Sequence, residues 1–371
     1  MRIGVPKEIK PQENRIGLTP ESVKVLTSNG HEVLVESNGG YEAGFDNEQY
    51  KKSGAKIVNK SEDIFNDSEI IVKVKEPLTN EIKMIRENQI VFTYLHLAAG
   101  KQLTEGLVKS KSVCIAYETI TDNNGRLPLL APMSAVAGRM SVQAGAHCLE
   151  KNQNGRGVLL GGAPGVEPAT VVILGGGVVG ENAALIATGF KAKVHIVDKS
   201  TRRLEQLKKI FGDKIIAEQS DKVDLKKLIS ECVLLIGGVL IPGAEAPKLI
   251  TKDMLKLMKR GSVIVDVAID QGGCVETSKP TTFANPTYIV DGVVHYCVAN
   301  MPGGVPRTST IALNKATLPF LSKLADKGYD KVFREDKNFL EGLNVFKGQV
   351  TYKAVADTFG YKYTSPNELI R

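Results

Sequence analysis

Short apolar runs alternate with polar, helix-compatible stretches along the first third of the chain. Residues 2–6 form the first such run, and Thr19 followed by Pro20 predicts a helix start, with Asn29 and Gly30 as its end. Further runs rich in β-branched residues predict strands at residues 31–37, 69–75, 88–96 and 112–118. Strands that alternate with helices in this way predict an α/β layer with a mainly parallel sheet.

A second series of apolar runs follows an Ala-rich segment, residues 133–150, which predicts one long connecting helix. The later runs, separated by helical stretches, predict five strands, enough for a complete doubly wound domain. These strands are expected at residues 171–175, 193–198, 232–238, 262–269 and 288–298. Beyond them, residues 308–328 predict a helix, and the remainder is polar and amphipathic without a strand pattern. We therefore expect a helical C-terminal part that packs on the first domain.

Composition indicates a folded chain, since 42% of its residues are hydrophobic. Its length of 371 residues predicts about two domains. The 48 Lys and Arg exceed the 41 Asp and Glu by a formal charge of +7. This excess is small for the length, and the densest basic stretch, residues 199–209, has the pattern of a solvated helix. Nucleic acid is therefore not an expected partner.

Location follows from what the sequence lacks. No window of about twenty residues is free of charge, glycine and proline, as a membrane span requires, and no signal-peptide h-region follows Met1. The five cysteines are an odd number without C-x-x-C spacing, which favours a reducing compartment. We expect a cytoplasmic protein without membrane partners, and the His and Cys spacing predicts no metal site.

The strongest chemical signal is a G-x-G-x-x-G motif formed by Gly175, Gly177 and Gly180, which follows a predicted strand and opens a predicted helix. In such loops the glycines allow a tight turn, a close approach of backbone to pyrophosphate and close packing of helix on strand. Asp198 ends the next strand, at the spacing expected for a carboxylate that binds ribose hydroxyls. This carboxylate favours NAD over NADP, although the neighbouring Arg202 and Arg203 weaken the inference. The alternative is a glycine-rich turn that binds nothing or another nucleotide.

Polar residues also stand at the predicted carboxyl ends of strands, where ligands of open α/β sheets gather. They are Lys75, His96, Glu118, Asp198 and Asp270. Three of them also have an ordinary structural reading: Lys75 as a solvated lysine, His96 as a hydrogen-bonded core residue and Asp270 as a cap. Arg15, in the loop after the first strand, could bind a carboxylate in a bidentate way or be a surface arginine. Glu118 receives no role from the sequence.

Several multi-residue motifs make the chain resemble the L-alanine dehydrogenases of the alanine dehydrogenase/pyridine nucleotide transhydrogenase family. The resemblance runs end to end and rests on MRIGVPKEIKPQENRIGLTP, VKVKEP, TYLHLAAG, APMSAVAGRMSVQAGA, ILGGGVVGENAA, DQGG and VANMPGGVPRTST. It implies NAD-dependent, reversible oxidative deamination of L-alanine to pyruvate and ammonium: a hydride passes from Cα to NAD, and the imine is then hydrolysed. It also implies a homohexamer.

The resemblance assigns roles residue by residue. Arg15 and Lys75 would hold the substrate, and His96 and Asp270 would be the catalytic pair. The cofactor contacts would be Ser134, Gly175, Gly177, Val178, Val179, Gly180, Asp198, Arg203, Ser220, Val239, Leu240, Val267, Ala268, Ile269, Asp270, Lys279, Val298, Ala299, Asn300 and Met301. Of these residues, Arg203, Ser220 and Lys279 lie outside the quoted motifs.

Together these features predict two doubly wound, Rossmann-like α/β domains. An NAD domain, residues 132–301, is expected to be inserted into a discontinuous substrate domain formed by residues 1–131 and 302–371. Two other functions remain open: the soluble NAD-binding subunit of a proton-translocating transhydrogenase, and a non-catalytic NAD sensor. The histidine of TYLHLA favours the dehydrogenase.

Overall fold

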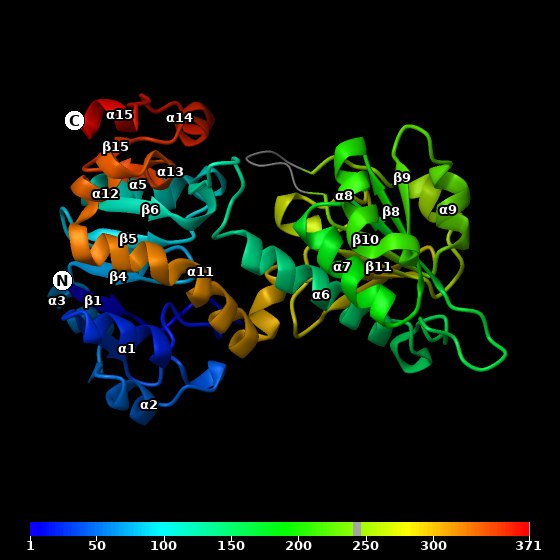
Figure 1. The fold of residues 1–371 in the computed structure, drawn as a ribbon, viewed down its shortest axis with the longest axis horizontal. Coiled ribbons are helices and arrows are strands. Elements are labelled where there is room, and N and C mark those ends of the chain that lie inside the picture. Colours follow the sequence, from blue (N-terminus) through cyan, green and yellow to red (C-terminus); the bar gives the residue numbers. More distant parts are fainter. Residues whose placement is uncertain (240–245, 371) are drawn as a thin grey trace. The chain divides into compact units, whose positions relative to one another are not determined.

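The structure is a computed structural model that describes residues 1–239 and 246–370. It divides into two compact units, unit 1 with Met1–Met133 and Val305–Arg371 and unit 2 with Ser134–Gly304. Each unit contains one mainly parallel sheet with helices around it (Figure 1), which confirms the predicted α/β class. Among the described residues, no helix is both long and apolar enough to cross a bilayer.

The unit 1 sheet has eight strands in the order β15-β14-β6-β5-β4-β1-β2-β3. Its strands are β1 (Arg2–Val5), β2 (Glu32–Glu36), β3 (Lys56–Val58), β4 (Ile70–Val72), β5 (Ile90–Thr93), β6 (Val113–Ala116), β14 (Leu343–Phe346) and β15 (Gln349–Val350). The six strands from the N-terminal part are all parallel. Three of the predicted strands end earlier than expected, so Lys75, His96 and Glu118 lie beyond strand ends rather than in them.

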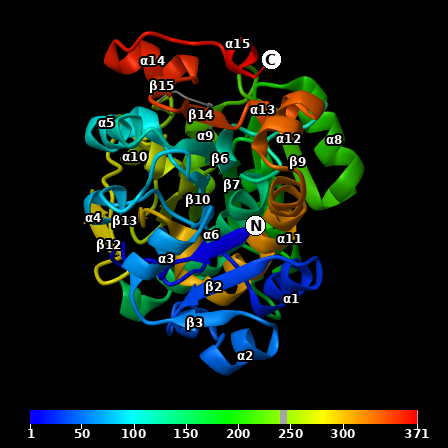
Figure 2. The ribbon, with the colours of Figure 1, turned by 90° about the vertical axis from the view of Figure 1, so that its left-hand side faces the viewer.

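Helices cover both faces of this sheet, as a parallel sheet requires. In Figure 2, α1, α11 and α12 lie to the right of the strands, and α3, α4 and α5 lie to the left. The helices are α1 (Pro20–Ser28), α2 (Asn47–Lys52), α3 (Ser61–Asp67), α4 (Thr79–Ile82), α5 (Lys101–Ser110), α11 (Pro306–Lys327), α12 (Tyr329–Glu335), α13 (Lys337–Leu340), α14 (Lys353–Phe359) and α15 (Pro366–Leu369). The predicted start of α1 is confirmed, since Thr19 Oγ1 accepts the Ser22 N–H at 3.1 Å.

The expectation of a purely helical C-terminal part is wrong. β14 pairs antiparallel with β6, and β15 pairs antiparallel with β14, so this part of the chain extends the unit 1 sheet. All four residues of β14 are buried. With four residues, β14 is too short to show an alternation of apolar and polar positions, and a short buried strand cannot be recognised by periodicity alone.

The unit 2 sheet has seven strands in the order β12-β13-β11-β10-β7-β8-β9. They are β7 (Thr170–Leu174), β8 (Lys193–Asp198), β9 (Ile215–Gln219), β10 (Leu234–Gly237), β11 (Val263–Asp266), β12 (Thr287–Val290) and β13 (Val293–Tyr296), with helices α6 (Ala131–Cys148), α7 (Val178–Gly189), α8 (Thr201–Phe211), α9 (Leu225–Glu231) and α10 (Lys252–Leu255). Alternate strand residues enter two separate cores: Val171 and Ile173 pack with residues of α6, α7 and α8, whereas Val172 and Leu174 pack with residues of α9 and α10.

Two features of this sheet differ from the prediction. Residues 288–298, expected as one strand, form the antiparallel hairpin β12–β13. Its turn is Asp291-Gly292, with φ of 50° and 80°, the positive values that a tight hairpin turn requires. Five strands were expected and the described residues of unit 2 form seven, because this run forms two strands and the edge strand β9 was not predicted.

Candidate functional site

The parallel strands of unit 1 run β3-β2-β1-β4-β5-β6, so the strand order reverses between β1 and β4. Ligands of such sheets bind outside the carboxyl ends of the strands at this switch point. Arg15 follows β1 and Lys75 follows β4, so the two predicted substrate-binding residues flank it. His96 follows β5 and Glu118 follows β6 at the same edge.

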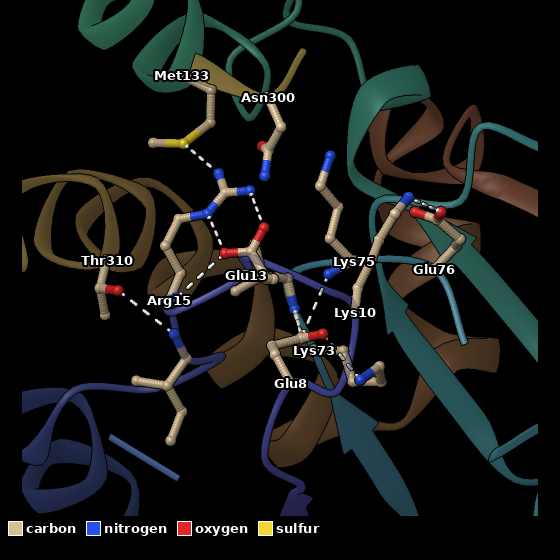
Figure 3. Close-up of polar contacts among 12 residues, drawn as sticks. Glu8, Lys10, Glu13, Arg15, Lys73, Lys75, Glu76, Met133, Asn300 and Thr310 are labelled. Carbon is tan, nitrogen blue, oxygen red and sulfur yellow. Dashed lines mark hydrogen bonds and ion pairs between the residues drawn. The ribbon is translucent and has the colours of Figure 1, made fainter. Parts of the chain in front are cut away.

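Arg15 is buried and is held by a carboxylate that sequence reasoning did not single out. Its Nε and Nη2 donate to the two carboxylate oxygens of Glu13, each at 2.6 Å, and its Nη1 lies 3.0 Å from Met133 Sδ (Figure 3). Burial alone would lower the pKa of Arg15, but Glu13 raises it. The guanidinium is therefore a fixed cation whose Nε–Nη2 edge is already occupied.

The backbone of Lys75 is held at both its N–H and its carbonyl. Glu8 Oε1 accepts the N–H groups of Val74 at 2.6 Å and Lys75 at 3.2 Å, and Thr93 Oγ1 donates to the Lys75 carbonyl at 3.0 Å. In Figure 3 the side chains of Arg15 and Lys75 extend in the same direction from neighbouring loops. Glu8 thus fixes the point from which the Lys75 side chain departs.

Glu8 also belongs to a buried charge cluster with Lys73 and Glu81. Lys73 Nζ lies 3.0 Å from Glu8 and 2.7 Å from Glu81, and the Lys73 side chain has no exposed area. Burial raises the pKa of Glu8, and the two carboxylates raise the pKa of Lys73 although burial alone would lower it. The cluster anchors the segment after β1 to the segment after β4 at the switch point.

His96 has a left-handed backbone, with φ 46° and ψ 40°, and begins the 3-10 turn Leu97–Ala99. Its ring lies nearly parallel to that of the buried Tyr94, with centroids 5.8 Å apart. The side chain is 47% exposed, which leaves it accessible to a small molecule. Accessibility and a titratable ring suit proton transfer.

The glycine motif of unit 2 has the geometry that a dinucleotide needs. Gly175 has φ +94°, and a Cβ on Gly180 would lie 1.9 Å from the Gly175 carbonyl oxygen, so both positions require glycine. A Cβ on Gly177 would meet no described atom within 4 Å. None of the described side chains caps the first turn of α7, which starts with the exposed Val178 and the buried Val179. Its N–H groups thus suit a phosphate.

Asp198, Arg203 and Ser220 gather beside this loop. Asp198 Oδ2 accepts the Gly176 N–H at 2.6 Å, and the Asp198 carbonyl accepts the Ser220 N–H at 3.1 Å. Arg203 Nε donates to the Gly176 carbonyl at 2.5 Å, and its Nη2 pairs with Glu181. Arg203 is therefore tied to the glycine loop itself, whereas the exposed Arg202 lies outside these contacts.

The other predicted cofactor contacts follow the strands β10, β11 and β13. These strands lie side by side in the sheet, and β10 is next to β7. Val239 lies close to Gly175: a Cβ placed on Gly175 would be 3.1 Å from Val239 Cγ2. Leu240 lies outside the described residues. Val267, Ala268, Ile269 and Asp270 belong to the 3-10 helix Val267–Gln271 after β11. Val298, Ala299, Asn300 and Met301 follow β13. Asp270 Oδ1 accepts the Asn300 N–H at 3.3 Å, which joins these two segments.

Ser134 and Lys279 are not at strand ends. Ser134 is one helical turn before Gly138 on α6, and a Cβ on Gly138 would lie 2.2 Å from the Val179 carbonyl oxygen. Ser134 therefore lies on the face of α6 that packs against the start of α7. Lys279 is exposed, and its described contact is a backbone N–H donated to the Tyr288 hydroxyl at 2.7 Å. The structure thus brings Ser134 toward the glycine loop and gives no such support to Lys279.

Comparison with protein families identifies the chain. The family models described as "Alanine dehydrogenase/PNT, N-terminal domain" and "Alanine dehydrogenase/PNT, C-terminal domain" match residues 4–137 and 141–353. The chain belongs to the alanine dehydrogenase/PNT family. An alanine dehydrogenase from Halomonas elongata is 56% identical to it over 100% of both chains.

Solved structures agree with the membership in the alanine dehydrogenase/PNT family. A structure of L-alanine dehydrogenase matches with a TM-score of 0.94 at 50% identity, covering 97% of this chain and 99% of that chain. A transhydrogenase structure from Sinorhizobium meliloti matches with a TM-score of 0.83 at 24% identity, covering 94% and 100%. At that identity the second match shows a shared fold alone.

Four buried carboxylates in this family member were missed by sequence reasoning: Glu8, Glu13, Glu81 and Asp266. Asp266 ends β11 and accepts hydrogen bonds from Ala268 N, Cys274 N, Val275 N and Ser278 Oγ at 2.6–3.2 Å, so it shapes the turn that carries Asp270. A carboxylate inside an apolar run, as in IVDVAI, was the available signal, because a buried charge needs partners. Glu8 and Glu13 lie in a polar loop and gave no comparable signal.

Proposed function

We propose that the chain is an NAD-dependent L-alanine dehydrogenase, which converts L-alanine reversibly to pyruvate and ammonium. The observation that carries the proposal is the gathering of Arg15, Lys75 and His96 at one edge of the unit 1 sheet, beside its switch point. Two cations suit a small carboxylate substrate, and an accessible histidine suits proton transfer. Curated relatives named alanine dehydrogenase, 50–56% identical over the full chain, support the same reading.

NAD is the cofactor that the unit 2 residues fit. The open backbone of Gly177 and the first turn of α7 would take the pyrophosphate, and Asp198 would take the ribose hydroxyls. Arg203 is engaged with Gly176 and Glu181, which supports NAD over a cofactor with a 2′-phosphate. The segments at Val239, Val267–Asp270 and Val298–Met301 would complete the contacts. Bound NAD supplies a hydride acceptor for the Cα hydrogen of alanine and, when reduced, a hydride donor for the imine of pyruvate.

The chain's own residues bind, orient and move protons. Arg15 and Lys75 would hold the substrate carboxylate, and Lys75 would polarise the carbonyl oxygen that develops as water adds to the imine. His96 would take a proton from the amine or water and return it in the reverse direction. Asp270 would orient that water or the amine.

Assembly and location extend the proposal. We expect a homohexamer in the cytoplasm, with L-alanine, pyruvate and ammonium as its small-molecule ligands and without nucleic acid or membrane partners. The five cysteines are all free and buried, which supports a reducing compartment. Burial raises the pKa of the Cys114 and Cys232 thiols to about 12, so neither is a thiolate at neutral pH. The proposed chemistry requires no metal.

One assay tests the proposal against its two alternatives. NADH absorbance is followed with pyruvate plus ammonium, and in parallel with glyoxylate and other 2-oxo acids. An alanine dehydrogenase consumes NADH when pyruvate and ammonium are both present, and it does not consume NADH when only one of them is present. NADH binding without consumption would instead indicate a sensor. Hydride exchange confined to pairs of nicotinamide nucleotides would indicate a transhydrogenase subunit.

A further inference from the structure

Glu118 faces the segment that carries His96, and the proposed function leaves it without a role. It lies on the 3-10 turn Tyr117–Thr119 after β6, the strand that neighbours β5. Its Oε1 accepts the His96 N–H at 2.6 Å and the Leu95 N–H at 3.1 Å, and its Oε2 lies 3.2 Å from Leu95 N. The Glu118 side chain is 13% exposed. A single side chain thus binds two consecutive amides at the end of β5.

These contacts hold His96 in a backbone conformation that it would not adopt by itself. A φ of 46° is uncommon for a residue with a Cβ and is kept only where surrounding contacts impose it. Glu118 supplies that restraint through the two amides, and the Tyr94 ring borders the imidazole from the side. Tyr94 is itself fixed, since its hydroxyl donates to the Leu129 carbonyl at 2.5 Å. The ring of His96 is therefore placed by two neighbours.

The same carboxylate also lies near the imidazole of His96. His96 Nδ1 lies 3.7 Å from Glu118 Oε1, too far for a direct hydrogen bond but close enough for attraction once the ring is protonated. We propose that Glu118 is a positioning residue: it fixes His96 with Nδ1 toward itself, so that Nε2 exchanges protons with the substrate, and it stabilises the imidazolium that forms. This inference rests on the proposed dehydrogenase function.

Three variants separate the charge of Glu118 from its role as a backbone acceptor. Glu118→Gln keeps an oxygen for the two amides but loses the charge, Glu118→Ala loses both, and Glu118→Asp keeps the charge on a shorter side chain. The matched control is Glu218→Gln, the same change at a second Glu–His pair, where Glu218 Oε2 lies 2.7 Å from His195 Nδ1 in unit 2. The measurements are kcat and KM with pyruvate, ammonium and NADH, NADH affinity by fluorescence, and the melting temperature.

We expect Glu118→Gln to lose kcat about ten- to a hundredfold, with KM for pyruvate and NADH affinity within about threefold of wild type. This is less than the roughly 10⁴-fold seen where a carboxylate bonds a catalytic histidine directly, because 3.7 Å is a longer separation. Glu118→Asp should recover part of the loss, and Glu218→Gln should keep the wild-type kcat. If Glu118→Gln kept the wild-type kcat, the role of Glu118 would be limited to accepting the two backbone N–H groups, and the inference would be overturned.

A second measurement decides the case if Glu118→Gln does not fold. In ¹⁵N-histidine-labelled wild-type protein, the neutral His96 ring should carry its proton on Nδ1, with the signal assigned by its loss in His96→Ala. A proton on Nε2 would overturn the inference. Wild-type protein that binds NADH but does not turn over pyruvate and ammonium would instead overturn the proposed function, and this inference with it.

Discussion

Arg15 is a buried cation whose charge is already matched, and this limits how it can act on a substrate. The bidentate bond to Glu13 satisfies its Nε–Nη2 edge. Because Glu13 balances the charge of Arg15, the guanidinium would act on a substrate carboxylate mainly through directional hydrogen bonds and less through net positive charge. Because an unpaired buried charge costs about 3–5 kcal/mol, Glu13 is also essential for keeping Arg15 inside the protein.

Replacing Arg15 with lysine tests this view, since lysine keeps the charge but cannot form the fork that Glu13 binds. We expect Arg15→Lys to weaken pyruvate and alanine by about 1.5–3 kcal/mol, or roughly 10- to 150-fold in KM, with NADH affinity unchanged. Arg307→Lys is the control, because Arg307 binds the Gly44 carbonyl at 2.9 Å outside the predicted site. An unaltered KM for pyruvate would remove Arg15 from the substrate site.

His96→Ala tests the proton-transfer role directly. Loss of a general acid or base lowers rates by about 10²–10⁴-fold, so kcat should fall by that range while NADH still binds. His147→Ala is the control and should keep the wild-type kcat, because His147 is an exposed residue of α6, 3.3 Å from Glu150, and none of the proposed proton transfers uses it. Stopped-flow NADH oxidation gives both values. Turnover near that of wild type in His96→Ala would exclude the histidine from catalysis.

At the scale of the strand–turn–helix element, the start of α7 depends on the absence of one side chain. Gly180→Ala would place a Cβ 1.9 Å from the Gly175 carbonyl oxygen, and because that atom belongs to the backbone, no side-chain rotation can relieve the clash. We expect a loss of about 1–3 kcal/mol in the free energy of unfolding, with weakened NADH binding. Urea unfolding with and without NADH measures both effects.

Gly189→Ala is the matched control on the same helix, since a Cβ there would meet no described atom within 4 Å. It should be neutral or stabilise the protein by up to about 1 kcal/mol. Equal stability of the two variants would show that α7 does not need close packing at Gly180.

How much of the fold was predictable depended on how strongly each element is patterned. The long helix from Ala131 and the strand–glycine–helix unit at Gly175 carry many consistent residues, and both were predicted. The edge strands β3 and β9 and the C-terminal β14 and β15 were not, because three of them have four residues or fewer and β9 is only partly buried, so none has a clear apolar pattern. The main partner of β14, the strand β6, is also distant in sequence. The Asp291-Gly292 turn did carry a hairpin signal, since an Asp-Gly pair between two apolar runs is typical of a two-residue hairpin turn, and the prediction of one strand overlooked it.

The candidate site was predictable only in part, for a related reason. Arg15, Lys75, His96 and Asp270 stand in distinctive motifs, so a resemblance could name them, and their roles stay predictions. Glu8, Glu13 and Asp266 act by folding back onto backbone or side chains at distances that only the tertiary structure defines. Sequence position gives no sign that Glu8 lies beside Val74 or that Glu118 lies beside Leu95.

At the scale of the whole molecule, the net charge of +7 does not indicate where chains associate, whereas exposed apolar side chains do. Leu159, Val166 and Phe190 are 71%, 62% and 46% exposed in unit 2. Leu159 and Phe190 line one depression of about 500 Å³, and a Cβ on the neighbouring Gly161 would lie 2.3 Å from the Phe190 carbonyl oxygen. Clustered exposed side chains of this kind are typical of surfaces that bind another protein chain. We expect a second copy of this chain to cover them.

Light scattering after gel filtration tests this expectation. Six chains of 40.1 kDa should give about 240 kDa for the wild type. Leu159→Glu places a charge in the apolar cluster, so it should shift the mass toward smaller species while each chain keeps its fold and its affinity for NADH. Ile289→Glu is the control, since Ile289 is 52% exposed on β12 and does not line that depression. If Leu159→Glu kept the wild-type mass, the cluster would lie outside the contact surface, and a wild-type mass of about 40 kDa would contradict the hexamer itself.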